Sequence, residues 1–201
     1  MMATTHALAG VLLAGVSLLV APEFAPVALL SGFAGGLAPD LDLYFAHRKT
    51  LHFPVYLPVA TGPALLLAVL APSTATIGLA AFVAAAALHS VTDVLGGGLE
   101  LRPWEGTSDR AVYSHYHGRW LTPMRWVGYD GAPADLGLAA TLALPVFALG
   151  AGGTVETLVI ASLVVSTGYA AFRKRLPALA EDLVGSLVPD PVLPYVPDRY
   201  R

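Results

Sequence analysis

Histidine and aspartate side chains gather near the ends of apolar segments in this sequence. Seven of them combine the chemistry and placement of metal ligands: His6, Asp40, Asp42, His47, His52, His89 and Asp93. Imidazole nitrogens combined with carboxylate oxygens suit zinc, manganese or iron better than calcium. The chain has no cysteine, which excludes thiolate ligands. The set therefore predicts a divalent metal cofactor.

Two local pairs stand out within this set. His89 and Asp93 are four residues apart, so on a helix they share a face, as two ligands or as a ligand and its orienting carboxylate. Asp40 and Asp42 follow Pro39, where two carboxylates could chelate one cation or bridge two. Taken singly, each pair is also typical of a helix end or a solvated turn. Their occurrence together favours a site.

Acid and base roles are open within the same set. One carboxylate or one histidine could stay unligated and act as general base, and we single out Asp42 and His52 for catalysis. His115 and His117 lie in a polar, aromatic stretch. They could join the site, or they could belong to an interfacial loop of tryptophan and tyrosine side chains.

The elements that must position these residues are apolar. The composition is 56% hydrophobic and 12% charged, whereas soluble domains carry about 25% charged residues. Six apolar runs approach the length of about 20 residues that a membrane-spanning helix needs: 5–21, 24–38, 54–71, 75–95, 135–151 and 154–172. We expect an all-α, polytopic bundle of about six transmembrane helices, with Gly32, Gly35 and Gly36 allowing close helix packing.

Basic residues predict the orientation of this bundle. All 11 lysines and arginines fall in alternate loops or after the last run, so six spans put them on one side: Arg48, Lys49, Arg102, Arg110, Arg119, Arg125, Arg173, Lys174, Arg175, Arg199 and Arg201. The positive-inside rule makes that side cytoplasmic, with both termini there. The candidate ligands lie at the same membrane depth.

Three regions follow from this topology. Residues 1–176 form the membrane bundle, with a cytoplasmic polar insertion at 96–134, and residues 177–201 form a cytoplasmic tail. Leucines 176, 179, 183 and 187 recur at helical spacing and predict a short surface helix. The first run could instead be a signal peptide, but it has no basic residue before it and five more runs follow.

The polar motifs, read in order, resemble the YdjM-like membrane-bound metal-dependent hydrolases. The motifs are Thr5-His6, Gly36-Leu37-Ala38-Pro39-Asp40-Leu41-Asp42, His47-Arg48 through His52, His89 through Asp93, and Pro103-Trp104. The resemblance covers roughly residues 4–105 and implies a multi-pass protein of the inner, cytoplasmic membrane with metal-dependent hydrolase activity. The chain departs from it at Phe53, where family members often have serine.

Two classes of function are consistent with these features. A hydrolase would act at the cytoplasmic face, where membrane lipid or a lipid-linked ester or phosphoester is the natural substrate. A non-enzymatic protein would use the cluster as a metal sensor, transport ions, or bind a partner through the insertion. Transport is disfavoured because no ionisable residue lies in the middle of a run. The net charge of −3 gives no reason to expect nucleic acid as a partner.

Overall fold

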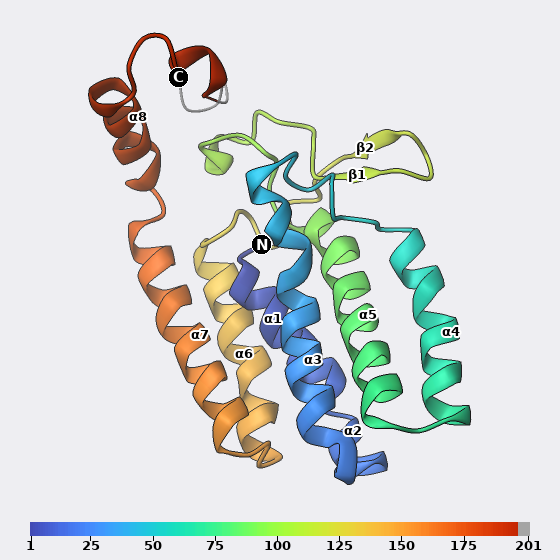
Figure 1. Cartoon of the computed structure of the whole chain (residues 1–201). Coiled ribbons are helices and arrows are strands. Elements are labelled where there is room, and N and C mark those ends of the chain that lie inside the picture. Colours follow the sequence, from blue (N-terminus) through green and yellow to red (C-terminus); the bar gives the residue numbers. More distant parts are fainter. Residues whose placement is uncertain (197–201) are drawn as a thin grey trace.

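Helices built from the apolar runs dominate the structure, a computed structural model that describes residues 1–196 (Figure 1). Their bounds are α1 Ala3–Ala14, α2 Ser17–Val20, α3 Ala25–Leu37, α4 Tyr56–Leu70, α5 Thr74–Thr92, α6 Pro133–Ala148, α7 Gly153–Phe172 and α8 Leu176–Leu187. Each of the six predicted runs contains a helix. The helices up to α7 lie side by side, so the loops between them collect at the two ends of the bundle (Figure 1).

Small residues bring the central helices together. Helix α3 packs against both α1 and α5, while α4 lies on the far side of α5 and α6 packs against α1 (Figure 1). Gly10 and Gly32 place the backbones of α1 and α3 in direct contact, and a β-carbon at either position would strike the carbonyl of the other. The predicted role of glycine in helix packing is confirmed at Gly32, and Gly10 adds a second such position that was not predicted.

Four helical segments within residues 1–196 are long and apolar enough to cross a membrane: Ala3–Val20, Pro22–Leu43, Thr74–Leu95 and Gly153–Phe172. Their outward faces expose large apolar side chains, among them Val20 and Val164. This is consistent with a membrane protein. Helices α4 and α6 are apolar but have only 15 and 16 residues, below the roughly 17–25 of a spanning helix. A six-span topology therefore stays a prediction.

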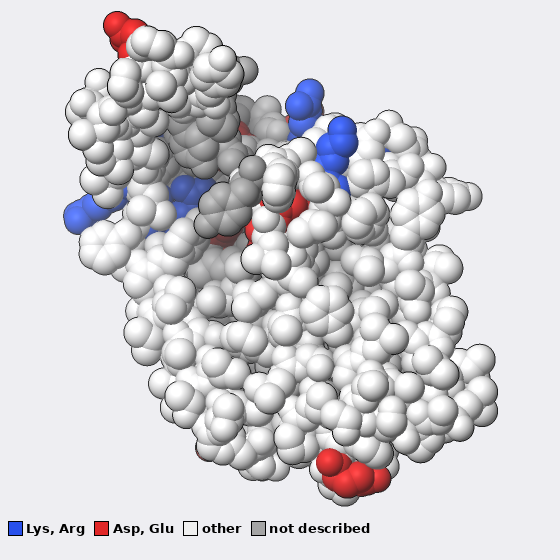
Figure 2. Space-filling view, in the orientation of Figure 1, with Lys and Arg blue, Asp and Glu red and all other residues white. Residues whose placement is uncertain are grey.

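Lysine and arginine side chains gather at one end of the bundle in Figure 2. A broad uncharged belt covers most of the rest of this face, and an acidic group lies at the opposite end. The segments 38–55 and 93–132 and the region after α7 meet at the end with the lysines and arginines (Figure 1). They contain every lysine and arginine of the described chain, since Arg199 and Arg201 lie outside the described residues. The sequence-based grouping of basic residues is thus reproduced in space, and we refer to this as the polar end.

The insertion departs from the all-α expectation. It contains an antiparallel hairpin of β1 Val112–Ser114 and β2 Arg119–Leu121, in which Val112 pairs with Leu121. The hairpin is attached to the ligand-bearing loop because the amide of Tyr113 donates to the carbonyl of Arg48 at 2.9 Å. All-α thus describes the bundle but not the insertion, whose short alternating polar and apolar stretch suits paired strands.

Helix α8 confirms the surface helix expected after the last run. Pro177 lies in its first turn, where the missing amide hydrogen costs nothing. Leu179, Leu183 and Leu187 are more than half exposed along it. An ion pair of 2.8 Å between Arg102 and Glu181 links α8 to the insertion, although both side chains are exposed and the pair contributes little stability.

Candidate metal centre

Five elements carry the predicted ligands to the polar end, and one of them is α1, which carries His6. Asp40 and Asp42 lie on a 3-10 helix, η2 (Ala38–Tyr44), that continues α3, and His52 follows in the loop to α4. His89 lies in the last turn of α5, and Asp93 begins a 3-10 turn, η3 (Asp93–Leu95), directly after it. The helix ends thus bring residues distant in sequence to one place.

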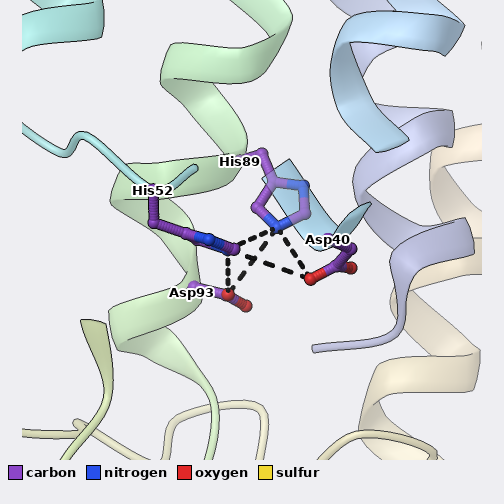
Figure 3. Close-up of side chains that lie close together, drawn as sticks. All are labelled: Asp40, His52, His89 and Asp93. Carbon is purple, nitrogen blue, oxygen red and sulfur yellow. Dashed lines mark hydrogen bonds and ion pairs between the residues drawn. The ribbon is translucent and has the colours of Figure 1, made fainter. Parts of the chain in front are cut away.

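The side chains of Asp40, His52, His89 and Asp93 converge on one point, and we call these four residues the ligand cluster (Figure 3). One ligand atom from each lies within 4.8 Å of the other three. His52 Nε2 is 3.2 Å from His89 Nε2 and 3.3 Å from Asp93 Oδ2, and Asp40 Oδ1 is 3.5 Å from His89 Nε2. A tetrahedral ion with bonds of about 2.0–2.2 Å has ligand-to-ligand edges of about 3.3–3.6 Å. The cluster has the dimensions of a metal site.

Hydrogen bonds on the outer sides of the two imidazoles determine what faces inward. His89 Nδ1 lies 2.6 Å from the carbonyl oxygen of Gly36, which can only accept, so Nδ1 carries the hydrogen. His52 Nδ1 lies 2.9 Å from Asp42 Oδ2 and donates to that carboxylate. In the neutral rings, both Nε2 atoms then turn lone pairs toward each other. A shared proton would relieve this repulsion at two atoms, whereas a metal cation satisfies all four ligands.

Asp93 adds an independent reason for a cation. Its side chain is buried, and its Oδ2 accepts no hydrogen bond from any residue of the described chain. A buried carboxylate oxygen without a donor is costly, so native structures rarely keep one. Burial disfavours the charged form of His52, but the hydrogen bond with Asp42 and the nearby charge of Asp93 outweigh it and raise the pKa of His52. The carboxylates thus favour positive charge at this point.

Asp42 lies outside the cluster, although we had expected it to be a metal ligand and a catalytic group. Its Oδ2 accepts from the amides of Lys49 and Leu51 at 3.3 and 3.1 Å as well as from His52. Its Oδ1 accepts from the amide of Arg48 at 3.2 Å. The carboxylate therefore folds the loop and orients His52, as carboxylates commonly do behind metal-binding histidines.

His6 and His47 flank the cluster on opposite sides. The ring of His6 stacks on that of His89 with centroids 3.7 Å apart, and its Nε2 lies 2.9 Å from Asp93 Oδ1. His6 thus holds two ligands in place from behind. The side chain of His47 is 19% exposed, and its Nδ1 lies 3.0 Å from Asp42 Oδ1. His47 is the histidine at the accessible edge of the cluster.

His115 and His117 are not members of the cluster. His115 Nε2 donates to the carbonyl of Lys49 at 2.7 Å, and His117 Nδ1 lies 2.8 Å from Ser114 Oγ. Both residues follow β1 in the hairpin turn. His115 supports the ligand-bearing loop from the insertion, and His117 stabilises the turn.

In the sequence Arg48 is one of the basic loop residues and part of the His47-Arg48 motif, and the structure buries it beside the cluster. Its side chain is 6% exposed, and its Nε lies 3.2 Å from Asp93 Oδ2 at an angle unsuited to a hydrogen bond. Burial opposes its charge, but the nearby carboxylates, Asp93 foremost, together outweigh burial and raise the pKa of Arg48. The one sequence signal was its position between His47 and His52.

A second buried carboxylate, Asp135, was also missed. It accepts from the hydroxyl of Thr5 at 2.7 Å and from the amides of Met2 and Gly131 at 2.7 and 3.1 Å. Asp135 lies in the first turn of α6 and ties it to the start of α1. It positions His6 through the neighbouring Thr5. Its sequence signal was a lone acidic residue at the start of an apolar run.

A cavity of about 830 Å³ adjoins the cluster at the polar end. Asp40, His47 and Arg48 form one wall, and leucines of α8 and of the 98–101 loop form the other. The side chain of Asp40 is 20% exposed, so a ligand atom is reachable from this space. The volume lies within the range of about 300–1,000 Å³ typical of small-molecule sites.

No known protein family, curated protein or solved structure matches the chain.

Proposed function

We propose that this chain is a membrane-bound, metal-dependent hydrolase that acts at the cytoplasmic face on a lipid-linked ester or phosphoester. The observation that carries the proposal is the ligand cluster: two inward-facing imidazole nitrogens and a buried carboxylate oxygen without a hydrogen-bond donor meet beside an accessible cavity. The motif order that resembles the YdjM-like hydrolases supports the same function.

The proposed topology has six spans in the inner membrane, with both termini and the insertion in the cytoplasm. Its support is the collection of basic residues at the polar end, where the ligand cluster also lies. Helices α4 and α6 would cross the bilayer despite their length, with local thinning accommodating the mismatch. The cavity then lies at the depth of the lipid head groups.

The residues of the cluster suit a divalent ion. Asp40, His52, His89 and Asp93 would hold it, and the mixed nitrogen and oxygen set suits zinc, manganese or iron. When bound, such an ion activates water and polarises an ester or phosphoester group. Asp42, His6 and the carbonyl of Gly36 keep the ligands oriented.

His47 is better placed as general base than Asp42 or His52. Asp42 already accepts several hydrogen bonds, and His52 points into the cluster. His47 lines the cavity, and Asp42 holds its ring from the other side. His47 would take the proton from water as the water oxygen attacks the ester carbon or phosphorus. It would then return the proton to the departing alcohol oxygen.

Metal analysis of detergent-purified protein tests the proposal. Wild type is expected to hold about one divalent ion per chain, and His89→Ala and Asp40→Ala to lose most of it, because a site with a ligand removed binds far more weakly. His117→Ala is the matched control and should keep its metal. Equal and negligible metal in all four proteins would contradict the metal site.

Hydrolysis separates the enzyme from the non-enzymatic alternative. Probes are p-nitrophenyl decanoate for esters and p-nitrophenyl phosphate for phosphoesters. His47→Gln is expected to keep its metal and to lose roughly 10²–10⁴-fold in rate, the usual contribution of a general base. Wild type that binds metal but hydrolyses neither probe would favour a metal-binding or regulatory protein.

A further inference from the structure

The backbone of Arg48 is held in a conformation that the local sequence alone would not favour. Its φ of 57° lies in the left-handed region, which is uncommon for residues other than glycine and costs free energy. Two hydrogen bonds hold the backbone there: its amide donates to Asp42, and its carbonyl accepts from Tyr113. The loop and the hairpin together therefore aim the guanidinium at the cluster.

The guanidinium is only partly used by the protein. Nη1 donates to the carbonyl of Gly97 at 2.8 Å, while Nε has no hydrogen-bond acceptor within residues 1–196. Arg48 also lines the cavity. Guanidinium groups with free donors are well suited to bind phosphate oxygens in pairs.

Carboxylates lie around Arg48, and its Nε is 3.2 Å from Asp93 Oδ2. A divalent ion in the ligand cluster would take up the charges of Asp40 and Asp93, and so leave the guanidinium of Arg48 free to pair with an anion. On the far wall, Asp130 is paired with Arg173 at 2.8 Å. Glu100 is the opposing charge, since both of its carboxylate oxygens lack a hydrogen-bond donor in the described chain.

Leucine side chains make up one side of the cavity. Leu99 and Leu101 line it from the loop after α5, and Leu176, Leu179 and Leu183 line it from α8. A soluble phosphate compound would gain nothing from these side chains, whereas a hydrocarbon chain would remove them from water, at roughly 25 cal/mol per Å² of apolar surface.

We propose that the cavity binds one phosphate-bearing membrane lipid, with the phosphate between the ligand cluster and Arg48 and the hydrocarbon chain against the leucines of α8 and the 98–101 loop. The inference rests on the proposed function and narrows its substrate to a lipid phosphoester. Arg48 then selects phosphate over the neutral carbonyl of a carboxyl ester.

Native mass spectrometry of the protein in a neutral maltoside detergent tests this binding. The probe is dodecyl phosphate, and dodecanol is the neutral probe of equal chain length. Wild type should bind one dodecyl phosphate per chain and prefer it to dodecanol. Arg48→Gln should weaken the binding of dodecyl phosphate about 10- to 100-fold, as expected for a lost charged hydrogen bond. The binding of dodecanol should not change. Equal affinity of wild type for both probes would overturn the proposal.

Two further comparisons keep the test decisive if Arg48→Gln does not fold. Glu100→Gln removes the opposing charge and should strengthen dodecyl phosphate binding, so weaker binding would count against the proposal. Leu179→Trp fills the cavity and should weaken both probes. Leu187→Trp, on the same helix but outside the cavity lining, is the matched control and should change neither.

The two proposals fail separately. In one outcome, wild type holds negligible metal but still prefers dodecyl phosphate, and Arg48→Gln still weakens that binding. This outcome would contradict the hydrolase but not the lipid site. Bound metal and ester hydrolysis without any preference for dodecyl phosphate would contradict the lipid phosphate site alone.

Discussion

Two polar groupings lie close together at the same end of the molecule, and they differ in how their charged groups are paired. In one, Asp130 accepts from Arg173 Nε at 2.8 Å, from Arg173 Nη2 at 3.2 Å and from the hydroxyl of Tyr169. Burial opposes the charge of Arg173, but Asp130 outweighs burial and raises its pKa. Each charge there has an opposite charge, and the grouping is complete in itself.

The ligand cluster lacks that internal balance. It places two imidazole nitrogens 3.2 Å apart and leaves Asp93 Oδ2 without a donor. Its outer sides, by contrast, are closely hydrogen-bonded to Asp42, His6 and Gly36. Rigid support from outside and a shortage of donors inside distinguish a site that binds a cation from one that only stabilises the fold.

The largest effect expected from this contrast concerns Asp42. The carboxylate of Asp42 orients His52 and increases the basicity of its Nε2. Asp42→Asn removes both effects. Metal affinity should fall about 10- to 100-fold, the usual result of losing such a partner. Competition between the protein and a zinc chelator measures it.

Asp109→Asn is the matched control for this prediction, because Asp109 is exposed in the insertion. It should bind zinc as wild type does. Circular dichroism would verify that the Asp42→Asn protein keeps its helices. An Asp42→Asn protein that folds and binds zinc as tightly as wild type would contradict the orienting role.

Gly36 links helix packing to the cluster, and its substitution should have the next largest effect. A β-carbon there would strike the backbone of His6 and Ala7, and the carbonyl of Gly36 holds His89. Gly36→Ala should lower the free energy of unfolding by about 1–3 kcal/mol, as over-packing usually does. Denaturation in mixed micelles measures it.

Gly62→Ala in α4 is the matched control, since no atom beyond its own chain neighbourhood lies near the position of its β-carbon. Its stability should equal or exceed that of wild type, because alanine favours helix more than glycine does. Equal losses at Gly36 and Gly62 would show that helix propensity, and not close packing, sets the stability of this bundle.

The sequence predicts the helices well because apolar length alone decides them. The sequence also predicts that the histidines and aspartates lie at one end of the bundle. The end of a helix can be predicted from composition and, for α3, from Pro39. His89 and Asp93 meet as their spacing indicates, with His89 Nε2 and Asp93 Oδ2 3.6 Å apart. These features depend on local periodicity, which a sequence displays directly.

Which of the predicted residues face the metal position, and which support them from outside, could not be predicted in this way. Asp40 and Asp42 lie on a 3-10 helix, whose three residues per turn send side chains two apart in different directions. One therefore faces His89 while the other faces the loop amides. The role of Arg48 depends on a left-handed backbone that no motif specifies.

The smallest effect on stability is expected in the grouping of Asp130, Arg173 and Tyr169, where the contrast with the ligand cluster is clearest. Tyr169→Phe removes one donor to Asp130 but leaves both bonds from Arg173, so no charge is stranded. The free energy of unfolding should fall by only about 0.5–1.5 kcal/mol, the net value of one hydrogen bond. Tyr116→Phe, at an exposed position, is the control and should change nothing. Metal content should stay at the wild-type level in both proteins, because neither tyrosine contacts the ligand cluster. If Tyr169→Phe instead removed the metal, the two groupings would be one connected network, and the distinction between a binding site and a structural ion pair would fail.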